Sequence, residues 1–406
     1  MTPDLDAPAP VTASPIPGLT VRVPASVAEA AEVMRAGAAA RRTIAFLGGG
    51  TDAGLAAAAP VDEVLRTTGL ARIVEYAPAD QIVVAEAGVT LAALQATLAR
   101  ERQRLALDPL HPDRATLGGI VAANAFGPLR TRYGTSRDLL IGMGMIRADG
   151  AFSRSGGKVV KNVAGFDLAR LLVGSLGTLG LVAEVAFRVH PLPEVRETVR
   201  LARVAPASAW EAARTLRDAR LEPAAVVAIG NPGALEVLFA FEGFEAGASA
   251  QARRAVEVLR PFGAPERLAP ADGGAAWARH DDARAAGTFT VRFSALPSAL
   301  GAAVAALAPV ADALEAPVLA AHSLLGVGFL AGTPTAGASL SAALDRARAA
   351  LDRAHGHAFV VRCPGPLRAG LDAWGPPPPA IALMRRLKER LDPDGRLAPG
   401  SFLGGI

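Results

Sequence analysis

The first part of the chain combines two hydrophobic periods. Alternating or wholly apolar runs predict strands, and apolar residues spaced three to four apart predict helices. Ser26 followed by Glu29 has the pattern of a capping box for the first helix, and Thr90 is the expected N-cap of the second. The expected strands are 19–23, 43–47, 71–76, 80–88, 105–107, 139–147, 151–155 and 181–191, and the expected helices are 26–40 and 90–101.

From about residue 195 the order of elements changes. A strand, a helix, two strands and a helix are followed, after a linker near Asp272, by the same order again and by a last strand at 357–363. Two successive βαββα units predict one antiparallel sheet of seven strands with helices on one face. The expected fold class is therefore α+β.

Proline-rich segments and composition suggest where the domains end. The run 376–379 consists of prolines and follows Trp374, so an element beyond it is expected to pack back on the first domain. The predicted organisation is a mobile tail at 1–18, a first domain at 19–193, a second at 194–375 and a C-terminal segment at 376–406.

Three groups of glycines stand where predicted strands or helices begin or end. Glycine is disfavoured inside regular elements, so its repetition indicates positive φ angles or close approach to another group. Amide groups left bare in such turns bind a pyrophosphate without a basic side chain. A large anionic cofactor is therefore predicted. The groups are Gly48, Gly49 and Gly50 before Thr51 and Asp52, Gly118 and Gly119 after Thr116, and Gly174, Gly177 and Gly180.

Gly48, Gly50 and Ala53 also satisfy the G-x-G-x-x-G/A pattern of a dinucleotide-binding βαβ unit. Pro60 argues against this interpretation, because a crossover helix starting at the glycine loop would meet the proline before it could cross the sheet. Glu75 lies near the position of a ribose-binding acid, but the segment after it continues as a second strand. A Rossmann unit is therefore not expected.

Composition narrows the class of protein. Hydrophobic residues make up 51% of the chain and charged residues 20%, which is a globular balance. The net charge is only +4 and no basic run is interleaved with aromatics, so nucleic-acid binding has little support. Cys363 is the only cysteine, which excludes an intrachain disulfide and suits a reducing, cytoplasmic compartment. Residues 316–344 carry no charge, but prolines and glycines interrupt them, so no transmembrane segment is expected.

Five segments, in this order and spacing, resemble the FAD-binding fold of the vanillyl-alcohol oxidase (PCMH-type) flavoproteins. Within that group they look most like the flavin-binding E subunit of bacterial glycolate oxidase. The resemblance covers residues 19–193 and 376–406, whereas the middle domain matches only in layout. The segments are LGGGTDAGL, ATLGGIVAAN, YGTSRD, NVAGFDLARLLVGSLGTLG and LKERLDPDGRLAPGSF.

The resemblance implies a two-subdomain FAD-binding domain under a cap domain, and it implies roles for residues at the matching positions. Asp138 and Thr116 also fit as helix caps, and the loop at Gly48 also fits as a plain turn. Related single-chain dehydrogenases have Glu where this chain has Leu176. The implied FAD contacts are Gly48, Gly49, Gly50, Thr51 and Asp52 around the pyrophosphate, Thr116, Leu117, Gly118 and Gly119 at the second phosphate and ribityl chain, Pro109 and Asp138 near the cofactor, and Gly177, Gly180 and Val182 along the adenine and isoalloxazine wall.

The catalytic residues are less defined. Oxidation of a 2-hydroxy acid requires a guanidinium for the carboxylate and a base for the hydroxyl proton, and the best candidates are Arg362 and His357 on the last strand. Relatives that act alone carry a His-rich metal cluster with a Gly-Asp-Gly-Asn-type segment, which this chain lacks, so no metal site is expected. The glycine loop holds no His or Cys, so FAD is expected to be non-covalent, with His111 as the other candidate for a covalent link.

The resemblance implies an FAD-binding subunit of a glycolate (2-hydroxy acid) oxidase complex that converts glycolate to glyoxylate. The implied partners are a larger flavin subunit and an iron-sulfur subunit, through which the chain would reach the inner membrane. Two alternatives remain open: a self-sufficient FAD-dependent D-2-hydroxy-acid dehydrogenase or other PCMH-type oxidase, and a non-catalytic assembly subunit with an empty cofactor groove.

Overall fold

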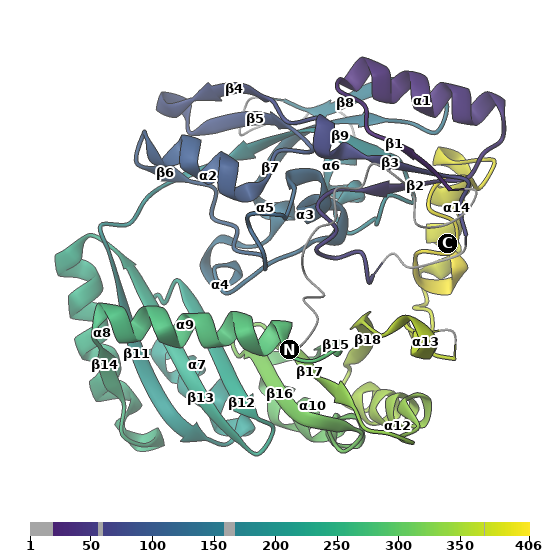
Figure 1. Ribbon diagram of the computed structural model, residues 1–406. Helices are drawn as coiled ribbons and strands as arrows, with labels where there is room; N and C mark the ends of the chain where they lie inside the picture. Colours follow the sequence, from purple (N-terminus) through teal and green to yellow (C-terminus); the bar gives the residue numbers. More distant parts are fainter. Residues whose placement is uncertain (1–18, 56–59, 158–166, 369) are drawn as a thin grey trace, which may run out of the picture.

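The computed structural model describes residues 19–55, 60–157, 167–368 and 370–406 (Figure 1). The tail expected at 1–18 lies outside these residues, and so does the NVAGF segment of the fourth motif. The described chain forms a first half, residues 19–193, and a second half, residues 194–375, and the C-terminal segment returns to the first half.

The first half contains two main sheets. One has three parallel strands in the order β1-β3-β2, and the other has five antiparallel strands in the order β4-β5-β9-β7-β8. Apolar side chains of α1, including Met34, fill the space between these sheets together with Leu65 and Leu181. The elements are β1 Thr20–Arg22, α1 Val27–Ala39, β2 Ile44–Leu47, β3 Glu63–Arg66, β4 Ile73–Ala77, β5 Ile82–Glu86, α2 Leu91–Ala99, β6 Gln103–Arg104, α3 Leu117–Ala123, α4 Arg130–Tyr133, α5 Ser136–Leu139, β7 Leu140–Ile146, β8 Phe152–Gly156, α6 Leu168–Leu172, β9 Leu181–Arg188 and β10 His190–Pro191.

Local sequence signals produce most of these boundaries. The Ser26 hydroxyl accepts a hydrogen bond from the Glu29 amide at 3.1 Å, and Thr90 accepts from the Ala93 amide at 3.3 Å, so both predicted N-caps are confirmed. The β4–β5 pair is antiparallel, and the described part of the connection from β2 to β3 contains only turns. The rejection of a Rossmann unit therefore agrees with the structure.

One predicted strand of the first half is wrong. Residues 105–107 form no ladder, and the short strand β6 lies just before them, where Arg104 pairs with His190 of β10. Leu105 and Leu107 are buried in the core of the first half. Their apolar character reflects this burial and not a strand.

The second half is one antiparallel sheet in the order β14-β11-β13-β12-β16-β17-β15-β18. It has eight strands where the pattern predicted seven, because β14, only three residues long, pairs with β11 at the sheet edge. Three residues are too few to show a hydrophobic period. The elements are β11 Val195–Val204, α7 Pro206–Asp218, β12 Ala225–Asn231, β13 Ala234–Gly243, α8 Glu245–Leu259, β14 Glu266–Leu268, α9 Pro270–Ala285, β15 Phe289–Ser294, α10 Leu300–Ala306, α11 Ala308–Ala311, β16 Leu314–His322, β17 Val327–Pro334, α12 Leu340–Asp352 and β18 His357–Arg362.

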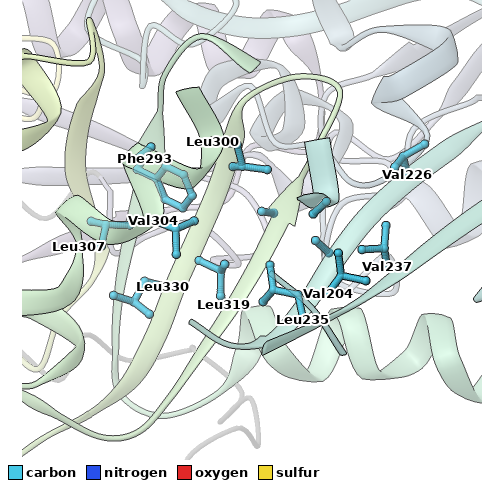
Figure 2. Close-up of a cluster of buried hydrophobic side chains, with 14 of the residues drawn as sticks. Val204, Val226, Leu235, Val237, Phe293, Leu300, Val304, Leu307, Leu319 and Leu330 are labelled. Carbon is cyan, nitrogen blue, oxygen red and sulfur yellow. The ribbon is translucent and has the colours of Figure 1, made fainter. Parts of the chain in front are cut away.

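Helices cover both faces of this sheet, so the prediction of helices on one face is wrong. Helices α7, α8, α10 and α12 bury the apolar side chains of one face, part of which Figure 2 shows. Helix α9 covers the opposite face, where its Ala276 and Ala283 pack on Val227 and Ile229. The segment around Asp272 looked like a linker because it contains adjacent glycines and because α9 buries polar side chains along with apolar ones.

The two halves meet through apolar and ionic contacts. The ring of Phe126, just after α3, lies 5.8 Å from the ring of Phe329 on β17. Arg104 and Glu242 form an ion pair at 2.5 Å, and the Glu242 side chain is almost fully buried. Burial makes this pair costly to separate, so it fixes the halves relative to each other.

The C-terminal segment packs on the first half. After the short helix α13, Gly365–Arg368, the chain reaches helix α14, Ile381–Leu391. Lys388 of α14 donates to Asp392 at 2.7 Å and to the carbonyl oxygens of Leu397 and Thr178 at 2.7 and 2.8 Å. The Asp392 side chain is fully buried, and the Lys388 ammonium group supplies its cation. The same ammonium group joins the C-terminal segment to the first half through the Thr178 carbonyl oxygen.

We predict that Lys388→Met lowers the free energy of unfolding by about 3 kcal/mol, because it leaves the buried Asp392 carboxylate without its cation. The measurement is chemical denaturation of the purified chain. Arg386→Met, on an exposed position of the same helix, is the matched control and should change stability by less than about 0.5 kcal/mol. Equal effects of the two variants would contradict this role of Lys388.

Candidate active site

The predicted glycine groups converge on one cavity in the first half. The loop after β2, the start of α3 and the turn before β9 all reach it, although they are far apart in the sequence. Asp52 is the one ionisable side chain among the lining residues. The lining residues are Ala45, Phe46, Leu47, Gly48, Gly49, Gly50, Thr51, Asp52, Ala53, Val64, Thr67, Thr116, Gly118, Gly119, Ala122, Ala123, Leu176, Gly177, Gly180, Leu181 and Val182.

Two of the glycines allow the loop after β2 to lie directly against the segment before α3. A Cβ atom on Gly49 would fall 1.7 Å from the carbonyl oxygen of Arg114, and one on Gly48 would fall 2.1 Å from the Thr116 hydroxyl oxygen. Gly50 has a φ of 76°, and a Cβ there would meet no atom within 4 Å. The loop backbone therefore packs closely on one side and borders open space on the other.

The structure does not bring all of the predicted cofactor residues to the cavity. Leu117 is fully buried behind it, and Pro109 is buried outside its lining. Asp138 forms a capping box, in which its carboxylate accepts from the Thr135 amide at 2.8 Å. Gly174 borders a different pocket, beside α14. For Asp138 the helix-cap interpretation therefore describes the contacts present.

His357 and Arg362 lie together on β18, but their contacts differ from those of a base and a carboxylate clamp. The exposed His357 ring lies 3.1 Å from the hydroxyl of Ser294, with Nδ1 as the nearer atom. The Nη2 atom of Arg362 donates to the carbonyl oxygen of Ala286 at 2.6 Å and to the Thr290 hydroxyl at 2.9 Å. Arg362 thus holds the end of α9.

Three arginines that no sequence pattern singles out lie where the halves meet, and of these Arg284 is buried and Arg130 and Arg292 are half-buried. Three guanidinium carbons surround the ring of Phe126: Arg130 at 4.4 Å, Arg292 at 4.7 Å and Arg284 at 5.9 Å from its centroid. Arg284 also lies 4.5 Å from the centroid of Phe329. Arg130 belongs to α4, Arg284 to α9 and Arg292 to β15, so both halves contribute. We call these three residues the arginine cluster.

Burial shifts the pKa values of the charged groups in this region. Desolvation lowers the pKa of Arg284 and lowers that of Arg292 to about 10, because the interior disfavours the charged form. Desolvation also raises the pKa of Asp52, against the opposing effects of a hydrogen bond from Thr51 and of both arginines. Because its pKa is raised, the Asp52 carboxyl group carries less negative charge than an exposed carboxyl group would, which reduces repulsion of an anionic group in the cavity.

The pKa of Asp108, which lies near the same arginines, is also shifted by burial. Desolvation raises its pKa to about 7, opposed by a hydrogen bond from the Leu129 amide and by Arg196 and Arg284. The bond from the Leu129 amide measures 2.9 Å. This group changes charge near neutral pH beside the arginine cluster.

Two buried histidines on the same side of the sheet are held neutral. Desolvation lowers the pKa values of His280 and His322, whose rings lie 5.5 Å apart edge to face. Neither ring nitrogen of His322 has a hydrogen-bond partner among the described residues. No group of three His, Cys, Asp or Glu side chains in the described chain is placed to hold a metal ion.

Residues 19–156 match the protein family described as an FAD binding domain. This match lies entirely within the first half of the protein. Most of the residues that line the cavity belong to the stretch 19–156, and the others belong to the segment from Leu176 to Val182. The predicted cofactor site therefore lies mainly in the part of the chain that matches the family.

Several curated proteins resemble parts of the chain. It is 40% identical over 129 residues to the glycolate oxidase subunit GlcE of Escherichia coli (strain K12), covering 32% of the chain and 37% of that protein. It is 44% identical over 92 residues to the glycolate oxidase subunit GlcD of Bacillus subtilis (strain 168), covering 23% and 20%. It is 38% identical over 149 residues to a D-lactate dehydrogenase of Archaeoglobus fulgidus, covering 36% and 32%. The matches thus span about a third or less of these relatives.

Solved structures confirm the fold over most of the chain. A p-cresol methylhydroxylase with substrate bound superimposes with a TM-score of 0.74 at 14% identity, covering 94% of this chain and 88% of that one. An alkyldihydroxyacetonephosphate synthase gives a TM-score of 0.71 at 17% identity, covering 93% and 76%. The expected PCMH-type fold is therefore confirmed, with an eighth strand and a helix on the second face of the sheet as the departures in the second half.

The FAD-binding domain fits its cofactor at the level of the backbone. The lining residues include no lysine or arginine, so a pyrophosphate would be held by amide groups of the glycine loop. Thr116, the N-cap of α3, accepts a hydrogen bond from the Gly119 amide at 3.3 Å and is packed against Gly48. Leu176 has a φ of 52° and donates its amide to the Ala122 carbonyl, which fixes the turn before β9.

We predict that Gly49→Ala reduces the flavin content of the purified chain at least tenfold, because the new Cβ displaces the loop from Arg114. Flavin is quantified by absorbance after removal of free cofactor. Gly247→Ala in α8, where a Cβ meets nothing within 4 Å, is the matched control and should keep full flavin content. Normal flavin content in Gly49→Ala would refute this account of the loop.

We predict that Asp108→Asn changes how stability depends on pH. The folded carboxyl group keeps its proton up to pH about 7, whereas the unfolded chain loses it near 3.8, so wild-type stability falls as pH rises from 4 to 7. An amide cannot ionise, so the variant should be more stable than wild type at pH 8, by at most about 4 kcal/mol, and similar at pH 4. Unfolding midpoints across this range test the prediction, with the exposed Asp113→Asn as a control that should follow wild type.

Proposed function

We propose that this chain is the FAD-binding subunit of an enzyme complex that oxidises glycolate or a related 2-hydroxy acid. The observation that carries the proposal is the convergence of the separate glycine loops on one cavity in an FAD-binding domain. Two of the similar curated proteins are named as glycolate oxidase subunits, which supports glycolate as substrate and a multi-subunit assembly. The proposed partners are a larger flavin subunit and an iron-sulfur subunit, with any attachment to the inner membrane made through them.

In this proposal a bound FAD would supply the hydride acceptor for oxidation of the carbon that carries the hydroxyl group. The chain's own residues perform the other tasks. The loop from Gly48 to Asp52 holds the cofactor through backbone groups, and Thr116 keeps that loop against α3. Strand β18 lies against the end of this loop, since a Cβ on Gly54 would lie 2.7 Å from the Val361 carbonyl oxygen. Helix α9 and strand β15 reach Phe126 of the first half through Arg284 and Arg292. This arrangement would exclude water from a substrate held between the halves.

A self-sufficient dehydrogenase is the second candidate, and two observations favour it. The similarity to a D-lactate dehydrogenase and the arginine cluster would suit a chain that binds a hydroxy acid by itself. His357 and Arg362 remain the predicted base and clamp in this version, although the present contacts of Arg362 are to α9.

Among the described helices, none combines the length and the apolar character that a membrane span requires.

The absorption spectrum of the purified chain, before and after anaerobic addition of glycolate or D-lactate, tests the function. We expect bound flavin that is bleached slowly or not at all by the isolated chain and rapidly once the partner subunits are added. Rapid bleaching of the isolated chain would favour the self-sufficient dehydrogenase. A folded, colourless chain that still binds the partner subunits would identify an assembly subunit and sink the proposal.

We predict that the FAD is bound without a covalent link, because the glycine loop contains no His or Cys. Precipitation of the polypeptide with acid should leave the yellow colour in the supernatant. His111, which lies close enough to Asp52 to affect its pKa, is the candidate for a link if the colour stays in the pellet. His111→Ala would then release the flavin, and the prediction would be wrong.

A further inference from the structure

The arginine cluster concentrates positive charge in a place where proteins seldom leave it unpaired. The Arg284 residue is 9% exposed, and its Nε and Nη1 atoms are buried without a hydrogen-bond partner among the described residues. The Nη1 atom of Arg130 is in the same condition. An unpaired buried donor destabilises the fold, so such a group calls for an explanation beyond packing.

The nearby carboxyl groups do not neutralise the cluster. Asp281, Asp108 and Asp52, in this order, act on Arg284 electrostatically, but no ion pair within 4 Å joins any of them to it in the described chain. Asp281 instead lies 2.9 Å from Nδ1 of His280. Asp108 instead accepts from the Leu129 amide, and Asp52 accepts from the Thr51 hydroxyl at 3.1 Å. The site therefore has three guanidinium groups and lacks an anion placed between them.

The position of the cluster connects it to the cofactor cavity. Asp52 lines that cavity and also interacts with Arg284 and Arg292. The rings of Phe126 and Phe329, one from each half, form an apolar surface next to the guanidinium groups. A small ligand with a charged end and a short carbon chain matches this combination of surfaces.

We propose that the arginine cluster binds the carboxylate of a small carboxylic acid at the junction of the two halves, with Arg284 as the main donor. A guanidinium presents parallel N–H groups that match the two oxygens of a carboxylate. The inference rests on the proposed function, in which this acid is the substrate, and it assigns the clamp to α9 and β15 in place of Arg362.

Arg362 has a positioning role in this arrangement. Its Nη2 atom lies within hydrogen-bond distance of the carbonyl oxygens of Ala286, at 2.6 Å, and Arg284, at 3.5 Å. These are the last carbonyl groups of α9, which the helix itself cannot pair. Arg362 thereby fixes the backbone from which the Arg284 side chain extends.

The test uses the FAD-loaded full chain and oxalate, a carboxylate with no C–H bond to be oxidised. Isothermal titration calorimetry should detect oxalate binding to wild type, with affinity at least tenfold lower in Arg284→Met and in Arg292→Met. Arg284→Lys should recover part of the loss. Arg279→Met, an exposed arginine on the same helix, should bind as wild type does. Unchanged affinity in Arg284→Met, or an equal loss in Arg279→Met, would overturn the proposal.

Inorganic phosphate distinguishes a carboxylate site from general attraction of anions. We expect phosphate to compete with oxalate at least tenfold more weakly than glycolate does. Competition at equal concentrations would show a non-specific cationic patch and would count against the proposal.

Stability without ligand separates a binding role from a structural one. Because Arg284 has unpaired buried donors, Arg284→Met should unfold at the same temperature as wild type or higher when no carboxylate is present. A clear fall in the unfolding temperature would show that the guanidinium supports the fold and would overturn the proposal. Flavin content of each variant is measured separately, so a chain without FAD refutes the proposed function, whereas a flavin-loaded chain that ignores oxalate refutes only this inference.

Discussion

The close contact between the loop after β2 and the segment before α3 is the constraint on which the cofactor cavity depends. The Gly49 backbone lies so near the Arg114 carbonyl that any side chain would collide with it, and Gly48 is equally close to Thr116. This contact brings together loops from three parts of the first half. It also leaves the loop lining the cavity, where its backbone amides could bind an anionic group without a basic side chain.

The second half of the protein adds charge where the first half supplies none. Its helix α9 and strand β15 place Arg284 and Arg292 beside Phe126, and Arg362 holds the end of α9. Arg284 is buried and Arg292 and Arg362 are half-buried, so water screens these groups less than at the surface and would weaken the attraction of a ligand's negative charge less there. The unpaired donors lower stability in the absence of a ligand, a cost that functional sites commonly carry.

Elements that depend on residues close together along the chain were predicted correctly from the sequence, whereas elements that depend on residues far apart along the chain were not. The caps Ser26 and Thr90 depend on neighbours within a few residues, so they could be predicted from the sequence. Helix α9 could not, because the groups that bury its polar side chains lie far away along the chain. The strand β14 was missed for the same reason, since only its pairing with β11 defines it.

The sequence alone determined which loops lack side chains and can approach other groups closely, because the absence of a Cβ is a property of each residue by itself, and from this it predicted an anionic cofactor. It also determined the alternation that makes the second half a single sheet. Only the tertiary structure decided which arginines are buried without partners. Arg284, Arg292 and Arg362 look alike in the sequence, and what separates them is the set of atoms that folding places around each guanidinium group. Desolvation and pairing depend on those distant atoms, so no local pattern records them.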